Sequence, residues 1–176
     1  MHCFRILDPK PRLIHAPGFP DRVLHHAIMA HAGPVLDRGL VDDTYACRTG
    51  KGTLAAVQRA CAQAGRFAWF AQIDIRAYFA SIGHERLLAL LERRFRNRDL
   101  LALLRRIVGA HQPTAGCGLP IGTLTSQYFA NFYLNGLDRL LLEHMRVRGY
   151  VRYMDDAVWC PASPPPALPP PACKSR

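Results

Sequence analysis

Apolar residues recur at every second position in one part of the chain and predict a β-strand there. From Phe67 to Ile75 the odd-numbered residues are all apolar, which predicts a strand whose opposite face carries Asp74. Short apolar runs interrupted by prolines across residues 4–14 predict two extended segments joined by a turn. These segments are the first candidates for sheet structure.

A second strand pattern lies near the end of the chain. Residues 150–153 and 157–160 are short strand-like runs, and Met154, Asp155 and Asp156 lie between them. Two strands separated by so few residues predict a β-hairpin. The two acids are therefore expected at its tip.

Apolar residues at helical spacing account for much of the remaining chain. The four predicted helices cover residues 21–33, 54–64, 84–108 and 125–148. Asp21 is expected to cap the first helix, and Gly33 with Pro34 to end it. Residues 97–99 are expected to interrupt the third helix, and Gly149 to end the fourth.

The composition suits one domain with a polyanionic partner. At 176 residues and 49% apolar content, the chain can bury one sizeable core. Lys and Arg number 23 against 13 Asp and Glu, a formal net charge of +10 that is typical of nucleic-acid-binding proteins. Because many soluble proteins are basic without binding nucleic acid, the charge only makes nucleic acid the first partner to test.

The cysteines and the hydropathy indicate a reducing, aqueous environment. The six cysteines are scattered, with no pair at the short spacing of a zinc or redox site, so we expect reduced thiols. No stretch of about 18 apolar residues could span a bilayer, and the start lacks the basic and apolar pattern of a leader. The expectation is a cytoplasmic protein without a membrane partner.

Three carboxylates are the candidates for chemistry. Joining a nucleotide to a 3′ hydroxyl uses two divalent cations, one activating the hydroxyl and one holding the pyrophosphate. Magnesium prefers oxygen ligands, so a few carboxylates on rigid elements suffice. Asp74 at a strand end, and Asp155 with Asp156 in a hairpin, have this form although they lie far apart in the sequence. The pair Asp42 and Asp43 lies in a turn-rich stretch and is interpreted as solvated surface.

Three sequence blocks carry these acids in a recognisable order. They are residues 73–84 (Ile-Asp-Ile-Arg-Ala-Tyr-Phe-Ala-Ser-Ile-Gly-His), 118–127 (Gly-Leu-Pro-Ile-Gly-Thr-Leu-Thr-Ser-Gln) and 153–156 (Tyr-Met-Asp-Asp). The blocks resemble motifs A, B and C of reverse transcriptases, and residues 8–12 and 21–23 resemble the preceding fingers motifs. The resemblance covers residues 4–160. The similar enzymes are those of bacterial retroelements, among them retron-like and group II intron-like proteins. The form of motif B most resembles that of enzymes from diversity-generating retroelements.

The resemblance implies an α+β fold, the polymerase palm, in which an antiparallel sheet packs on helices. Residues 1–66 would form partial fingers with the fingers-palm connection, and residues 67–160 the palm with motifs A, B and C. The implied activity is that of an RNA-directed DNA polymerase, a nucleotidyltransferase. Its implied partners are an RNA template, a DNA or RNA primer, dNTPs and, in this subgroup, an accessory RNA-binding protein.

The resemblance also implies a metal site. Asp74 and Asp155 would ligate two Mg²⁺ ions, with Mn²⁺ as an alternative. The backbone carbonyl of Ile75 would be a further ligand, and Asp156 would complete the acidic cluster.

Other residues are implied in nucleotide binding. Phe79 matches the steric gate that leaves no room for a 2′ hydroxyl, and Lys10 with Arg12 matches the cations that grip the triphosphate. The loop from Gly122 to Gln127 would let backbone approach the nascent base pair. Ile121 stands where retroviral and intron enzymes carry glutamine, and loss of that amide is expected to relax the contact with the nascent pair and favour error-prone copying.

The end of the chain departs from the family pattern. Residues 161–176 hold half of the chain's 14 prolines, which predicts a disordered or polyproline II tail. The family pattern would continue into a helical thumb, so a truncated chain or a frameshift product is expected. Without a thumb, primer and template would be held weakly and in a salt-sensitive way.

Two other functions fit the same residues. One is a catalytically inactive, basic RNA-binding remnant of the same fold, because intact acids show only that the chemistry was once encoded. The other is an RNA-dependent RNA polymerase, which Phe79 and motif B disfavour because such an enzyme would prefer a polar group that recognises the 2′ hydroxyl.

Overall fold

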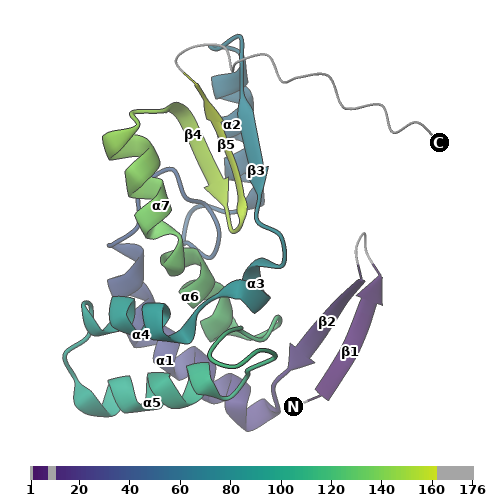
Figure 1. The fold of residues 1–176 in the computed structure, drawn as a ribbon, viewed down its shortest axis with the longest axis vertical. Coiled ribbons are helices and arrows are strands. Elements are labelled where there is room, and N and C mark those ends of the chain that lie inside the picture. The colour runs from purple at the N-terminus through teal and green to yellow at the C-terminus, as the bar shows by residue number, and fades with distance from the viewer. Residues whose placement is uncertain (1, 8–10, 162–176) are drawn as a thin grey trace.

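The computed structural model describes residues 2–7 and 11–161 (Figure 1). Lys10 and the proline-rich segment 162–176 therefore lie outside the described residues, and of Arg12 only the backbone is described. The predictions for these residues stay predictions.

An antiparallel hairpin begins the chain, as the proline-interrupted apolar runs predict. β1 (His2–Leu7) pairs with β2 (Pro11–Ala16), and Phe4 lies opposite Ile14. The hairpin projects to one side of the molecule (Figure 1). The backbone amide of His15 donates to the carbonyl of Ile121 at 2.7 Å, which attaches β2 to the motif B loop.

A three-stranded antiparallel sheet forms the other β element. Its order is β3 (Ala71–Asp74), β5 (Asp156–Cys160) and β4 (Arg148–Tyr153). The predicted hairpin at residues 150–160 is therefore confirmed. The predicted strand 67–75 is too long, because its pairing with β5 begins only at Ala71, and in the same register Pro161, which has no N–H to donate, would stand opposite Trp69. Trp69 and Phe70 are accordingly exposed, at 54% and 67%.

Helices fill most of the remaining chain. They are α1 (Phe19–Asp37), α2 (Thr53–Ala64), α3 (Tyr78–Ser81), α4 (His84–Glu92), α5 (Arg98–Gly109), α6 (Leu124–Tyr133), α7 (Asn135–Arg139) and the π-helical segment η1 (Leu140–His144). The predicted interruption near residues 97–99 is confirmed. There the side chain of Asn97 accepts a hydrogen bond from the amide of Leu100 at 2.9 Å and caps α5.

The first helix does not end at Gly33 and Pro34 as predicted. It runs on to Asp37, and it begins with Pro20 in its first turn rather than with an Asp21 cap. A proline inside a helix costs about 3 kcal/mol or more, but tertiary packing offsets this cost. Leu36 is buried, and a Cβ added to Gly33 would lie 3.1 Å from the Tyr128 ring, so α1 and α6 approach closely here.

The fourth predicted helix is also shorter than expected. It is interrupted for one residue at Leu134, and its helical structure ends with η1. Arg146 then adopts a left-handed backbone with φ 51°, which reverses the chain three residues before Gly149. Gly149 lies inside β4, at φ 60°, where the register with β5 shifts.

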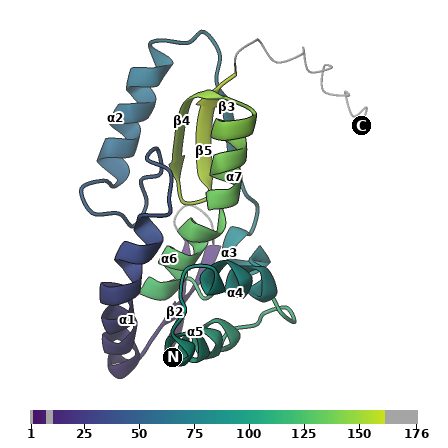
Figure 2. The ribbon, with the colours of Figure 1, turned by 90° about the vertical axis from the view of Figure 1, so that its left-hand side faces the viewer.

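The helices and the sheet share three apolar clusters. The largest lies among α1, α4, α5 and α6 and includes the fully buried side chains Leu104 and Phe129. Leu141 and Tyr150 belong to a cluster between α7, η1 and one face of the sheet, while Val151 packs against α2 on the other face. Figure 2 shows α7 in front of the sheet and α2 beside β4. This mixed arrangement of helices and antiparallel sheets confirms the α+β fold class and resembles a palm.

Two other expectations concern thiols and membranes. The five cysteines of the described ranges are all free, in agreement with the expected reduced state. None of the described helices combines the length and the apolar composition needed to cross a bilayer.

The burial of Leu104 predicts a large loss of stability on truncation. We expect Leu104→Ala to lower the free energy of unfolding by about 3 kcal/mol, because it leaves a cavity at a completely buried position. Leu54→Ala, at a position that is 71% exposed, is the matched control and should change it by less than about 0.5 kcal/mol. Urea unfolding followed by circular dichroism measures both, and similar losses would contradict the described core.

The contact between β2 and the motif B loop predicts a requirement for glycine at position 122. Gly122 has φ 111°, and an added Cβ would lie 2.9 Å from Cγ2 of Ile14. We expect Gly122→Ala to destabilise the protein by about 2 kcal/mol and to make the β1–β2 hairpin more sensitive to limited proteolysis.

Gly50→Ala is the control for this substitution. Gly50 also has a positive φ, 74°, but an added Cβ there meets nothing within 4 Å. Equal sensitivity of the hairpin in both variants would show that the close approach to Ile14 is unimportant.

Candidate active site

Two of the three candidate acids lie opposite each other in the sheet. Asp74, the last residue of β3, is the register partner of Asp156, the first residue of β5, and Tyr153 of β4 is the partner of Asp156 on its other side. Directly opposed residues of antiparallel strands project from the same face. Tyr153, Asp156 and Asp74 therefore form a row across the sheet. Asp156 lies in the strand, not at the hairpin tip as predicted.

This row lies on the sheet face whose Val151 packs against α2, at the exposed end of that face. Ile73 and Ala157, which pair with each other, belong to the opposite face under α7 and η1. All three residues of the row are exposed, and Asp74 follows the alternating burial pattern of β3. The predicted placement of Asp74 on the face opposite Ile73 is confirmed.

The third acid lies in the turn next to the row. Met154 and Asp155 form the two-residue connection between β4 and β5. Met154 has a left-handed backbone, with φ 58°, and its half-buried side chain packs against the main core. Asp155 is half-buried. The fold thus unites Asp74 with the distant acids 155 and 156, as a shared site requires.

Proximity of the three acids does not by itself make a preassembled metal centre. The described residues contain no group of three or more His, Cys, Asp or Glu side chains that could hold a metal ion. The three acids lie side by side in the sheet and its turn without forming such a group. Their oxygen donors nevertheless suit Mg²⁺, which proteins usually bind through one or two carboxylates together with water and substrate phosphates. Ile75, the other predicted metal ligand, directly follows β3 and packs against the main core.

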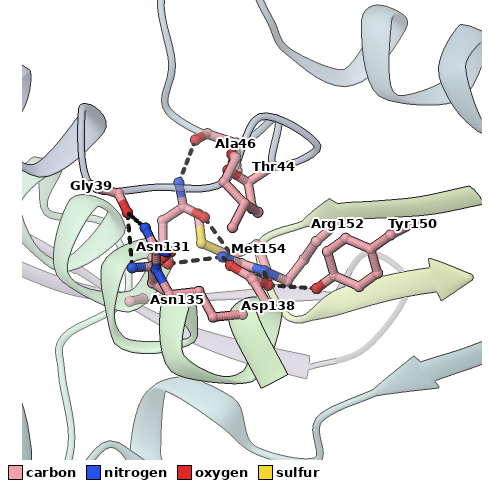
Figure 3. A network of polar contacts seen from close by, with 12 residues as sticks. Gly39, Thr44, Ala46, Asn131, Asn135, Asp138, Tyr150, Arg152 and Met154 are labelled. Carbon is pink, nitrogen blue, oxygen red and sulfur yellow. Dashed lines mark hydrogen bonds and ion pairs between the residues drawn. The ribbon is translucent and has the colours of Figure 1, made fainter. Parts of the chain in front are cut away.

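A buried arginine pairs with Ala157 on the sheet face opposite Asp74 and Asp156. Figure 3 shows this residue, Arg152, among its polar partners. Arg152 is 1% exposed, and its Nε and Nη2 donate to the two carboxylate oxygens of Asp138, each at 2.6 Å. Its Nη1 donates to Oδ1 of Asn131 at 2.9 Å and to the carbonyl of Met154 at 2.7 Å. Nη2 also donates to the backbone carbonyl of Asn131 at 3.0 Å.

The electrostatics of this network keep Arg152 charged. Burial lowers the pKa of its guanidinium, but the hydrogen bonds and the charge of Asp138 outweigh burial, so the net shift is upward. Burial, followed by the charge of Asp138, raises the pKa of Tyr150, whose hydroxyl donates to the same carboxylate. Sequence reasoning missed this network. Its only signal was an arginine on the apolar face of a predicted strand.

Motif A and motif B are held together by backbone hydrogen bonds. The amide of Leu119 donates to the carbonyl of Phe79 at 2.8 Å, and the amide of Gly118 donates to that of Ile82 at 2.9 Å. Nε2 of the buried His84 donates to the carbonyl of Gly118 at 2.6 Å, so this histidine has a packing role. Phe79 is half-buried against the main core.

The remaining predicted nucleotide-binding residues lie at the start of α6. Ile121 is half-buried, while Gly122 and Gln127 are exposed. Gly122 and Gln127 line a cavity of about 210 Å³ together with Arg22 and His26 of α1. The structure therefore brings part of motif B next to a fingers motif.

Comparison with known proteins agrees with this architecture. The chain is 23% identical over 151 residues to the group II intron-encoded protein LtrA of Lactococcus lactis, a match that covers 81% of the chain and 25% of LtrA. It is 33% identical over 79 residues to an uncharacterized 91 kDa protein in the cob intron of Schizosaccharomyces pombe, covering 42% of the chain and 10% of that protein. The chain thus matches a quarter or less of the length of these relatives.

A family model matches a much larger share of the chain. Residues 8–164 match the family described as reverse transcriptase (RNA-dependent DNA polymerase). This range includes motifs A, B and C and both strands that carry the acids. The chain therefore belongs to the reverse transcriptase family.

Proposed function

We propose that this chain is a catalytic core of an RNA-directed DNA polymerase that transfers nucleotides from dNTPs to a primer 3′ hydroxyl. The observation that carries the proposal is the register of the sheet. It places Asp74 opposite Asp156 at the exposed end of one sheet face, with Asp155 in the adjoining turn. A substrate as large as a primer-template can approach carboxylates on such a face.

The acids would act as ligands. Asp74, Asp155 and Asp156, with the carbonyl of Ile75, would hold two Mg²⁺ ions, or Mn²⁺ ions in their place. Bound there, the ions would lower the pKa of the attacking hydroxyl and neutralise the leaving pyrophosphate. The row of Asp74 and Asp156 lies on strands whose other face is packed, so these side chains start from a rigid backbone.

The nucleotide would be positioned by motifs A and B. The ring of Phe79 packs against the main core, and its backbone is attached to Leu119 through a hydrogen bond; from there the ring would exclude a 2′ hydroxyl. Gly122 and Gln127 border the cavity beside α1 and would contact the template-nucleotide pair. Lys10 and Arg12 would hold the triphosphate, and Ile121 would contact the nascent pair loosely, which is consistent with error-prone copying.

The charge of the chain supports an RNA template with its primer as the partner. A formal net charge of +10 attracts phosphate groups, and it makes binding weaker as salt rises. An accessory RNA-binding protein would supplement this contact.

Primer extension by the purified chain tests the activity. We expect short, dNTP-dependent extension of a primed RNA template at low salt. Asp155→Asn should reduce the rate at least about 100-fold, because it removes a metal-binding charge. Asp42→Asn, in the other adjacent pair of acids, is the matched control and should leave the rate unchanged.

The alternatives give different results in the same assay. No extension by the unsubstituted chain would favour an inactive RNA-binding remnant. Equal use of ribonucleotides would favour an RNA polymerase. Extension over many nucleotides would contradict the predicted weak hold on the primer-template.

The proposed gate predicts a change of sugar selectivity. We expect Phe79→Val to raise incorporation of ribonucleotides relative to deoxynucleotides by about tenfold or more, because a smaller side chain makes room for the 2′ hydroxyl. Phe70→Val, at an aromatic residue that is 67% exposed beside β3, is the control. Competitive single-nucleotide incorporation measures the ratio, and an unchanged ratio in Phe79→Val would remove Phe79 from this role.

A further inference from the structure

The turn that carries Asp155 has an unfavourable backbone conformation. Met154 has φ 58°, a left-handed conformation that only glycine adopts without steric opposition from a Cβ atom. Asp155 follows directly, so the direction of its side chain depends on this conformation being kept. Some other interaction must compensate for the strain.

The guanidinium of Arg152 supplies such an interaction. Its Nη1 donates to the carbonyl of Met154 at 2.7 Å, the carbonyl of the strained residue itself. Because Arg152 is 1% exposed, water does not compete for this carbonyl from the arginine side. A hydrogen bond from a charged donor in such surroundings is stronger than one between neutral groups.

The guanidinium is itself fixed in place. An arginine side chain has five N–H donors, and here five hydrogen bonds are made: two to Asp138, two to Asn131 and one to Met154. The acceptors belong to α6, α7 and the turn. A lysine has three donors on a single nitrogen and cannot reproduce this planar fork.

Asp138 and Asn131, which bind the guanidinium, are themselves held in place, and so is the backbone of Arg152. Asp138 accepts a hydrogen bond from the hydroxyl of Tyr150, and Nδ2 of Asn131 donates to the carbonyl of Ala46 at 2.8 Å. The amide of Arg152 donates to the carbonyl of Asp43 at 2.9 Å. Through Arg152, the position of the Met154 carbonyl thus depends on α6, α7, β4 and the loop that contains Asp43 and Ala46.

We propose that Arg152 is a positioning residue that keeps the turn at Met154 and Asp155 in the geometry needed for metal-dependent nucleotide addition. This role deepens the proposed function and rests on it. Arg152 does not touch the reacting atoms, since it lies on the opposite face of the sheet from Asp74 and Asp156. It acts through the carbonyl of Met154.

A double-mutant cycle with Met154→Gly separates positioning from general stability. Glycine accepts the left-handed conformation without strain, so the turn should then depend less on the guanidinium. We expect Arg152→Lys to lower kcat about tenfold and to raise the Mg²⁺ concentration for half-maximal rate, with the KM for dNTP changed less than about twofold. In the Met154→Gly background the same substitution should lower kcat by only about twofold or threefold.

A charge-balanced variant guards against misfolding. Arg152→Lys leaves Asp138 incompletely paired, and a buried charge without its partner can unfold the protein. Arg152→Gln combined with Asp138→Asn removes both charges together and should fold. It is expected to show the same loss of kcat and the same relief by Met154→Gly.

Amide hydrogen exchange supplies a readout that does not need activity. We expect faster exchange at residues 155–157 in the Arg152 variants, with little change at residues 158–160 of the same strand. Equal kcat losses with and without the Met154→Gly substitution, or uniform exchange along β5, would overturn the positioning role. Inactivity of the unsubstituted chain would instead contradict the proposed function, and the exchange experiment would still decide the role of Arg152.

Discussion

The ion pair between Arg152 and Asp138 is the interaction on which the sheet and its helices depend. Transferring two charges from water to the interior costs several kcal/mol per ion, and only complete hydrogen bonding repays that cost. Both carboxylate oxygens and all the guanidinium donors are occupied here. β4, α6 and α7 therefore have one favourable arrangement relative to each other, and sliding any of them would expose an unpaired charge to the core.

The same pair decides which side chains reach solvent. Side chains alternate along a strand, so burying Arg152 against α7 turns Tyr153 toward the opposite face, at its exposed end. Ala157 pairs with Arg152 and shares its buried face, which turns Asp156 outward as well. The exposure of the acids is thus a consequence of the polar core on the other side of the sheet. A basic side chain and an acidic site are linked through the period of the strand rather than by direct contact.

Local sequence patterns predicted the elements better than their ends and contacts. The alternation from Phe67 to Ile75 placed Asp74 on the correct face, but strand length depended on where β5 stops, which is a tertiary property. Pro34 ends a helix by local rules, yet the packing of Leu36 carries α1 past it. The partners of Arg152 could not be predicted because Asn131 and Asp138 lie on a helix pattern that also suits an ordinary apolar core. The sequence motifs identified the acids, but the pairing of Asp74 with Asp156 could be known only from the fold.

The strand order also has a consequence for how the protein is made. β5 is the last strand in the sequence, yet it lies in the middle of the sheet, between β3 and β4. During synthesis β3 has no strand to pair with until more than eighty further residues have been added. Long-range pairing of this kind slows folding and leaves an unpaired edge on the nascent chain. The acidic row is therefore among the last features to form, because the strand that joins β3 to β4 is the last one to be made.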